Sequence, residues 1–185
     1  PPNPQSVYGK TKLQGDVSVM KNCSRNLIFR TSWIFGVHGN NFLKSILQAA
    51  TKRHRLDVVV DQIGTPTSSM LISEVTADIL KKSSHLQPED DCWGLYHLSA
   101  SGQTTWYDYA RYIISKAGTL GYTLKASPVT IRPIMTKDYP SLANRPANSQ
   151  LDTTKLHQTF GVELPEWKLG VDRVLGLLLN QRKQE

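Results

Sequence analysis

Cysteine is scarce in this sequence, and long apolar runs are missing from it. Its two cysteines, Cys23 and Cys92, stand far apart without a Cys-x-x-Cys spacing, which favours reduced thiols and a cytoplasmic location. No stretch approaches the roughly 20 apolar residues of a membrane span, and none resembles a signal peptide. The sequence therefore predicts neither a membrane protein nor a disulfide-stabilised secreted domain.

Metal-binding and nucleic-acid-binding patterns are missing as well. The five histidines show no His-Glu-x-x-His or other ligand spacing, so no metal site is predicted. The 22 basic and 15 acidic residues give a net charge of +7, which suits an anionic ligand. Because the basic residues are scattered, they do not predict a nucleic-acid surface. The sequence leaves open both a homodimer and a dependence on Mg²⁺.

A tyrosine and a lysine at helical spacing stand near the beginning of the chain. Prolines favour an extended start, and Ser6 is placed to cap a helix after it. Tyr8 and Lys12 are four residues apart, so their side chains leave from one helix face. A nearby cation lowers the pKa of a phenol, which is near ~10 in water, so the pair is a candidate proton donor and acceptor. Spacing alone is weak support, because Tyr112 and Lys116 share it on what reads as an ordinary amphipathic helix face.

The chain opens on Pro1 without an initiator methionine, and the Tyr8 helix follows almost at once. We therefore expect that the sequence is a fragment whose N-terminal portion is missing. Its 185 residues are enough to bury one substantial core.

Strands, loops and helices alternate three times after this helix, which predicts an α/β fold with a mainly parallel sheet. The expected strands, the first of them buried, cover residues 27–30, 56–60 and 94–98. The expected helices cover residues 42–52 and 70–82, and a third begins at a cap formed by Thr104 or Thr105.

The last third of the chain reads differently. Residues 128–140 are expected to be irregular, with one short extended piece over 129–131. Asp152 or Thr153 is placed to cap a short helix through Leu156, and residues 171–179 form a final apolar helix.

Several other residues have ordinary structural interpretations when taken one by one. A lone tryptophan such as Trp33 most often packs in a core. Asn40 and Asn41 are typical helix-capping residues, and a loop arginine such as Arg145 is most often a solvated charge. None of these residues by itself indicates a function.

Taken together, the motifs resemble one family. The phrase Asn3-Pro4-x-x-x-Tyr8-Gly9-Lys10-x-Lys12 resembles the active-site helix of the extended short-chain dehydrogenase/reductases. Six further blocks follow in the order and spacing of the dTDP-4-dehydrorhamnose reductase family, over a resemblance that runs from Asn3 to about Val174: Arg30-Thr31-Ser32-Trp33-Ile34-Phe35-Gly36, Gly39-Asn40-Asn41-Phe42, Asp61-Gln62-x-Gly64-x-Pro66-Thr67, Gly94-Leu95-Tyr96-His97-Leu98, Thr104-Thr105-Trp106-x-Asp108-Tyr109 and Arg145-Pro146-x-Asn148-Ser149-x-Leu151-Asp152.

The resemblance implies the C-terminal part of a doubly wound, Rossmann-like parallel sheet plus a smaller mixed α/β substrate-binding region. Residues 1–185 would form a single truncated extended-reductase domain. Residues 1–60 would be the remainder of the Rossmann-like core with the catalytic helix, and residues 61–185 largely the substrate-binding lobe, with elements interleaved back into the core. The family's Gly-rich dinucleotide turn and catalytic Ser/Thr are not found here.

The resemblance also implies an activity. In the family, NADPH or NADH delivers hydride to the C4 ketone of dTDP-4-dehydro-L-rhamnose, giving dTDP-L-rhamnose for cell-surface polysaccharides. Tyr8 would be the proton donor, and Lys12 would lower its pKa and hydrogen-bond the nicotinamide ribose. Thr31 and Ser32 would lie beside the nicotinamide carboxamide.

Five substrate-binding residues follow from the same resemblance. Trp33 would offer a flat apolar wall to the deoxysugar, and Gln62 would contribute to the same site. Asn40 and Asn41 begin a helix whose backbone N–H groups would face phosphate oxygens. Arg145 would clamp the diphosphate with its forked guanidinium.

Three alternatives remain open at this level. The first is another extended reductase, an epimerase or a dehydratase. Such an enzyme would require different residues after the Arg30 strand, so Trp33 argues against it. The second is a non-catalytic regulatory relative such as the β subunit of methionine adenosyltransferase, which shares the phrase around Tyr8. The Arg-Thr-Ser-Trp and Asp-Gln-x-Gly-x-Pro-Thr blocks favour the reductase over it. The third is that the chain by itself is inactive because half of the site is missing.

Overall fold

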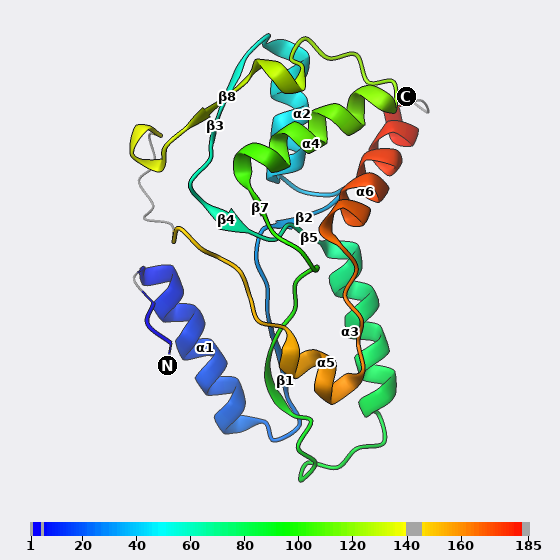
Figure 1. Cartoon of the computed structure of the whole chain (residues 1–185). Helices are drawn as coiled ribbons and strands as arrows, with labels where there is room; N and C mark the ends of the chain where they lie inside the picture. The colour runs from blue at the N-terminus through cyan, green and yellow to red at the C-terminus, as the bar shows by residue number, and fades with distance from the viewer. Residues whose placement is uncertain (1, 5, 140–145, 183–185) are drawn as a thin grey trace.

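The computed structural model describes residues 2–4, 6–139 and 146–182. Figure 1 shows two groups of helices, an upper and a lower one, joined by strands that run between them. The upper group contains α2 (Phe42–Lys52), α4 (Trp106–Thr119) and α6 (Trp167–Arg182). The lower group contains α3 (Ser69–Ser83) and α5 (Thr154–Phe160), with α1 (Val7–Asn22) at its edge.

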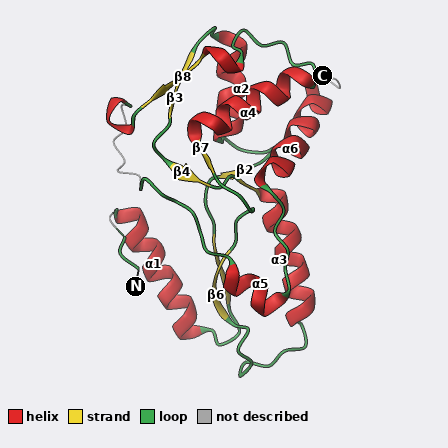
Figure 2. Cartoon of the chain, viewed as in Figure 1, coloured by secondary structure: helices red, strands yellow, loops and turns green. Residues whose placement is uncertain are grey.

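The strands are short and pair two by two, as Figure 2 makes visible beside the longer helices. Three of the four pairs formed by the described strands are parallel, which confirms the predicted α/β class with mainly parallel strands. The parallel pairs are β1 (Leu27–Arg30) with β6 (Gly94–His97), β2 (Ile34–Phe35) with β5 (Thr67–Ser68), and β3 (Leu56–Val59) with β8 (Ile131–Ile134). The antiparallel pair is β4 (Ile63–Gly64) with β7 (Thr104–Thr105).

Side-chain caps fix where the main helices begin. The Ser6 hydroxyl accepts a hydrogen bond from the Gly9 backbone N–H at 3.0 Å and starts α1. Asn41 caps α2 through the Lys44 N–H at 3.1 Å, and Thr105 caps α4 through the Asp108 N–H at 3.0 Å. Each cap satisfies an N–H group that has no partner inside the helix. The predicted starts of these three helices are confirmed.

Apolar side chains gather in two separate clusters. The larger one lies between α2, α4, α6 and the β3–β8 pair, and its fully buried members include Leu43, Ala50, Tyr109, Ile113, Val171 and Leu175. The smaller one lies between α3, β6 and α5, around Ile79, Tyr96, Leu98 and Leu156. The partly buried Leu71 of α3 packs against both clusters. The division at residue 60 stays a prediction.

The structure corrects several local predictions. Strand β1 is half-buried along its length rather than buried, and β6 is its one pairing partner among the described strands. Residues Pro128–Thr130 form a 3₁₀ turn, η1, and the extended piece follows it as β8. A proline at the start of a helical turn is favourable, which explains why the extended stretch begins later. Helices α5 and α6 both run further than their apolar residues indicated.

Within the described ranges, no helix combines the length and the apolar character that a bilayer crossing needs.

Candidate active site

Tyr8 and Lys12 lie on α1, the most open helix of the described chain. No side chain of α1 is buried, and Tyr8 is 74% exposed. Lys12 is exposed as well, so both groups of the predicted pair face solvent on one side of the helix. Both side chains are therefore accessible to a ligand.

An ion pair connects α1 to the strand that follows it. Asp16 accepts hydrogen bonds from Nε and Nη2 of Arg30 at 3.0 and 2.7 Å. Arg30 is the last residue of β1, so the next residues, Thr31 and Ser32, stand at the carboxyl end of that strand. In open α/β sheets this is the end at which ligands bind.

Thr31 and Ser32 differ in how their hydroxyl groups are satisfied. Ser32 Oγ donates to the Thr65 carbonyl oxygen at 3.4 Å. Thr31 Oγ1 is buried and has no hydrogen-bond partner in the part of the chain that the structure describes. Buried hydroxyl groups are normally satisfied, so this atom suits a polar ligand group at the end of β1. The placement of Thr31 and Ser32 beside a nicotinamide amide, which the resemblance implies, stays a prediction.

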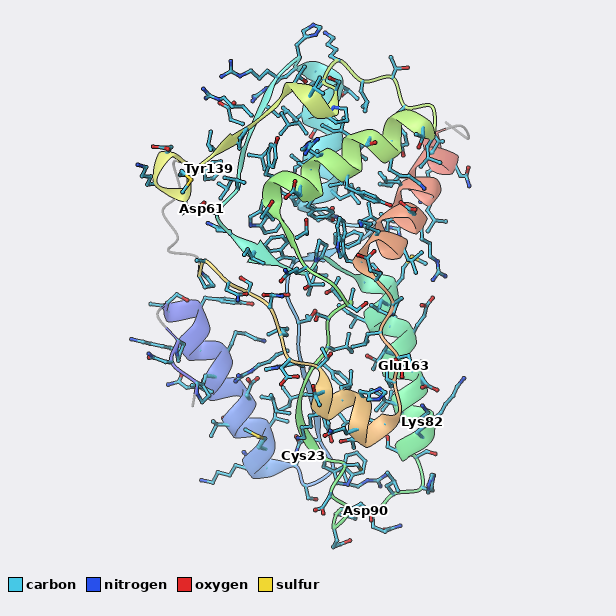
Figure 3. The ribbon with its side chains drawn as sticks, in the orientation of Figure 1. Cys23, Asp61, Lys82, Asp90, Tyr139 and Glu163 are labelled. Carbon is cyan, nitrogen blue, oxygen red and sulfur yellow. The ribbon has the colours of Figure 1, made fainter. Side chains whose placement is uncertain are left out.

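A cavity of about 790 Å³ brings Trp33 and Gln62 together. Aromatic side chains form much of its wall, and Gln62, Thr136 and the charged residues Arg53, Arg55 and Asp57 also line it. Its rim includes Tyr139, which Figure 3 shows near Asp61 at the end of the β3–β8 pair. An apolar cavity with a few placed polar groups is the usual form of a small-molecule site. The aromatic members are Trp33, Phe35, Phe42, Trp106, Tyr109 and Tyr139.

Trp33 has an unusual backbone and a close aromatic neighbour. Among the described residues it is the one non-glycine residue with a positive φ, of 47°. For a bulky side chain this conformation is rare and strained, and such residues concentrate at functional sites. Its indole stacks on that of Trp106, with 3.5 Å between ring centroids and 11° between the planes.

Asn40 and Asn41 lie apart from this cavity. Asn41 caps α2 and also donates from Nδ2 to the Gly36 carbonyl oxygen at 2.8 Å, so its amide group is occupied. Asn40 is exposed. Both border a second cavity of about 370 Å³ beside Lys44 and Tyr122. Arg145 lies outside the described residues.

Trp106 and Thr136 also belong to the site, although the sequence analysis did not propose them as ligand-binding residues. Trp106 Nε1 donates to Gln62 Oε1 at 3.1 Å, and Gln62 Nε2 donates to Thr136 Oγ1 at 3.0 Å. Trp106 stands in the family-like block Thr104-Thr105-Trp106-x-Asp108-Tyr109, and this block could have marked it as a site residue. Thr136 stood in a stretch that read as irregular, where no pattern marked it.

Two tyrosines of α4, Tyr109 and Tyr112, differ from Tyr8 in their surroundings. Burial raises the pKa of Tyr109 well above the usual value, and its hydroxyl has no partner among the described residues. Burial and a hydrogen bond to Asp172 raise the pKa of Tyr112 to about 12. Tyr112 and Lys116 both bind Asp172, each at 2.8 Å, so this second pair is occupied in holding α4 to α6. It has a structural role, as its sequence context indicated.

The architecture defines an α/β protein of the Rossmann-like class, with an aromatic cavity beside its parallel strand pairs. Comparisons with known proteins then give the family. A family model described as the RmlD substrate binding domain matches residues 1–179. The chain belongs to this family, which confirms the resemblance inferred from the motifs.

Several relatives share the name dTDP-4-dehydrorhamnose reductase. The dTDP-4-dehydrorhamnose reductase of Salmonella typhimurium is 44% identical over 173 residues, which are 94% of this chain and 56% of that protein. The crystal structure of a dTDP-4-dehydrorhamnose reductase from Clostridium acetobutylicum has a TM-score of 0.83 at 33% identity, over 96% of this chain and 57% of the other. The Bacillus anthracis dTDP-4-dehydrorhamnose reductase, solved in complex with NADP, has a TM-score of 0.75 at 30% identity, over 95% and 56%. The chain therefore spans a little over half the length of these relatives.

Proposed function

We propose that this chain carries the proton donor and the sugar-binding side of a site that reduces dTDP-4-dehydrorhamnose to dTDP-rhamnose with NADPH. The observation that carries the proposal is the 44% identity to a reductase of that name, over 94% of the chain. The cavity that joins Trp33 and Gln62 supports it from the structure. The ligand of the Bacillus anthracis relative favours NADPH over other cofactors.

The chain's own residues have distinct roles in this proposal. Bound NADPH supplies a hydride to the C4 carbonyl carbon. Tyr8 donates its phenolic proton to the carbonyl oxygen, and Lys12 stabilises the phenolate that remains. The unpartnered hydroxyl of Thr31, with Ser32 beside it, offers hydrogen bonds to the nicotinamide amide at the end of β1. Lys12 would also hydrogen-bond the nicotinamide ribose, and Tyr8 would contact the cofactor as well.

The substrate contacts follow from the cavity and from the sequence. Trp33 and Gln62 would contact the deoxysugar in the cavity that they line. Asn40 and Asn41, at the N-terminus of α2, offer backbone N–H groups to phosphate oxygens. Arg145 would pair with the diphosphate through two parallel hydrogen bonds. A homodimer and a cytoplasmic location remain predictions.

We expect the chain alone to be inactive, for a physical reason. Tyr8 is 74% exposed, so in the chain alone water surrounds the proposed proton donor. A closed site that excludes water strengthens the electrostatic interactions within it. The chain alone should therefore oxidise no NADPH in the presence of dTDP-4-dehydrorhamnose.

A chimera tests the proposed function. This chain replaces the matching 173 residues of the Salmonella typhimurium reductase, and NADPH oxidation is followed with dTDP-4-dehydrorhamnose as substrate. The proposal expects turnover by the chimera. A chimera that folds, binds NADPH and leaves dTDP-4-dehydrorhamnose unreduced would contradict it. dTDP-glucose, which has no ketone at C4, serves as the control substrate.

A further inference from the structure

Both faces of the Trp33 indole are covered by other parts of the chain. Trp106 covers one face at 3.5 Å between ring centroids. Gly64 lies against the other. A Cβ atom added to Gly64 would stand 2.7 Å from both Cζ2 and Nε1 of Trp33 and closer still to Cε2, the atom bonded to both. This pattern places the added atom over the plane of the ring.

The two neighbours must lie on opposite faces. An atom inserted between rings 3.5 Å apart would touch both of them, and the atoms nearest to the added Cβ all belong to Trp33. The backbone of Gly64 does not have a positive φ, so its conformation does not require glycine. Its lack of a side chain instead allows the indole of Trp33 to approach closely. A ligand in the cavity consequently meets the edge of Trp33 and not its flat face.

A directed chain of hydrogen bonds fixes Trp106 on its side of the stack. An indole N–H can only donate, so Gln62 must present its oxygen to Trp106 and its NH₂ group to Thr136, at 3.1 and 3.0 Å. Thr136 Oγ1 then donates to Asp61 Oδ1 at 2.7 Å, and the Thr136 backbone N–H donates to the same oxygen at 2.9 Å. The donor-only indole and the acceptor-only carboxylate set the direction of every bond between them.

Strand pairing brings these residues together from distant parts of the sequence. Ile63 pairs with Thr105 in the antiparallel β4–β7 ladder, which sets Gln62 beside Trp106. The Thr67 N–H donates to the Trp33 carbonyl oxygen at 3.2 Å next to the β2–β5 ladder, which holds the strained Trp33 backbone beside the Gly64 segment.

We propose that Gly64, Gln62 and Thr136 are positioning residues that clamp Trp33 and Trp106 into one rigid wall of the cavity. Gly64 holds the free face of Trp33, and Gln62 and Thr136 hold the ring of Trp106. The strained backbone of Trp33 persists because the surrounding contacts fix its ring from both sides. The role of this wall in sugar recognition rests on the proposed function, whereas the clamp itself does not.

Circular dichroism of the chain tests the clamp without any activity. Two indoles stacked at 3.5 Å couple their transitions and give an exciton couplet. Trp33→Phe and Trp106→Phe should each remove the couplet, and Trp93→Phe should leave it, because Trp93 has no indole neighbour among the described aromatic contacts. These three variants assign the signal.

Two matched pairs of variants then probe the positioning residues. Gly64→Ala should remove most of the couplet, and Gly118→Ala should keep it, because a Cβ at Gly118 meets open space. Thr136→Val should weaken the couplet, and Thr136→Ser should restore it by returning the hydroxyl. If Gly64→Ala does not fold, the comparison of Thr136→Val with Thr136→Ser still tests the clamp. A full couplet in folded Gly64→Ala, or in Thr136→Val, would overturn the clamp.

The chimera adds a kinetic readout. Gly64→Ala and Thr136→Val should raise KM for the sugar nucleotide by about tenfold, with a much smaller change in kcat, since misplacement of a positioning group weakens substrate alignment. KM for NADPH should stay constant. If the couplet responds as expected while the chimera is inactive on dTDP-4-dehydrorhamnose, the clamp stands and the proposed function fails.

Discussion

Arg30 and Asp16 connect the candidate catalytic helix to the sheet. Two nitrogens of the Arg30 guanidinium donate to Oδ2 of Asp16 at 3.0 and 2.7 Å, and the Asp16 side chain is only 13% exposed. α1 buries none of its side chains, so it has little apolar contact with the rest of the molecule. The position of Tyr8 relative to Thr31 therefore depends strongly on this pair.

Cutting the pair should loosen α1. Asp16→Ala keeps a good helix former on the helix and removes the carboxylate that Arg30 binds. We expect it to lower the free energy of local opening of α1 by about 1.5–3 kcal/mol, the range for hydrogen bonds to charged groups. Amide hydrogen exchange should accelerate in α1 and stay constant in α4. Asp78→Ala is the control, because Asp78 pairs with Lys82 on the exposed surface of α3. Equal exchange in both variants would count against the tether.

Removing the phenol of Tyr8 should remove catalysis in the chimera. Tyr8→Phe takes away only the proton donor, and general acid catalysis contributes roughly 10²–10⁴-fold. NADPH oxidation should fall by that factor, while NADPH binding, measured by fluorescence titration, stays nearly intact. Tyr112→Phe is the matched control, because it has the same spacing to a lysine and binds Asp172 instead. Similar losses in both variants would refute the assignment.

Alkaline pH should destabilise the chain through Tyr112. The pKa of this phenol is near ~10 in an unfolded chain and is raised to about 12 in the fold, by burial first and then by Asp172. The folded state therefore holds the proton more tightly, and the stability that this gives is complete below the unfolded value. It is lost as the pH rises through the folded value. Urea midpoints measured across this window should fall less steeply in Tyr112→Phe than in the parent chain.

Arg145 gives a prediction that rests on its sequence context. It precedes Pro146, which restricts the backbone, and a forked guanidinium suits a diphosphate. In the chimera, Arg145→Ala should weaken sugar-nucleotide binding by roughly 1.5–3 kcal/mol. KM for the sugar nucleotide should rise far more than KM for NADPH. Arg145→Lys should recover part of the loss, because it keeps the charge without the fork. Unchanged KM values would indicate that Arg145 is a solvated surface charge that does not bind the diphosphate.

Local chemistry made much of the fold predictable from the sequence. Ser6, Asn41 and Thr105 cap helices because their side chains reach backbone N–H groups two or three residues ahead, a relation that any sequence displays. Helix α2 begins and ends as predicted, since its apolar spacing and its cap agree. The 3₁₀ turn at Pro128 was misread because β-branched residues follow the proline, and their extended preference applies only from Ile131 onward.

The geometry of the site was harder to predict, because it depends on contacts between distant segments. Trp33 and Trp106 are far apart in the chain and meet through two separate strand pairs. Nothing in the sequence around Trp33 indicates a positive φ, which tertiary contacts impose. The motif Asp61-Gln62-x-Gly64 signalled a family, but the reason for its glycine became visible only when the indole was found against it.

The side chain of Leu71 gives the two apolar clusters a shared member. Substitutions at distant sites without common partners add in their effects on stability, within about 0.3–0.5 kcal/mol. The effects of truncating Ile113 in one cluster and Leu156 in the other should therefore sum. Leu71 contacts both, so a double-mutant cycle that includes it should depart from additivity in either direction. Leu71 is therefore a point at which the packing of one cluster is coupled to the packing of the other.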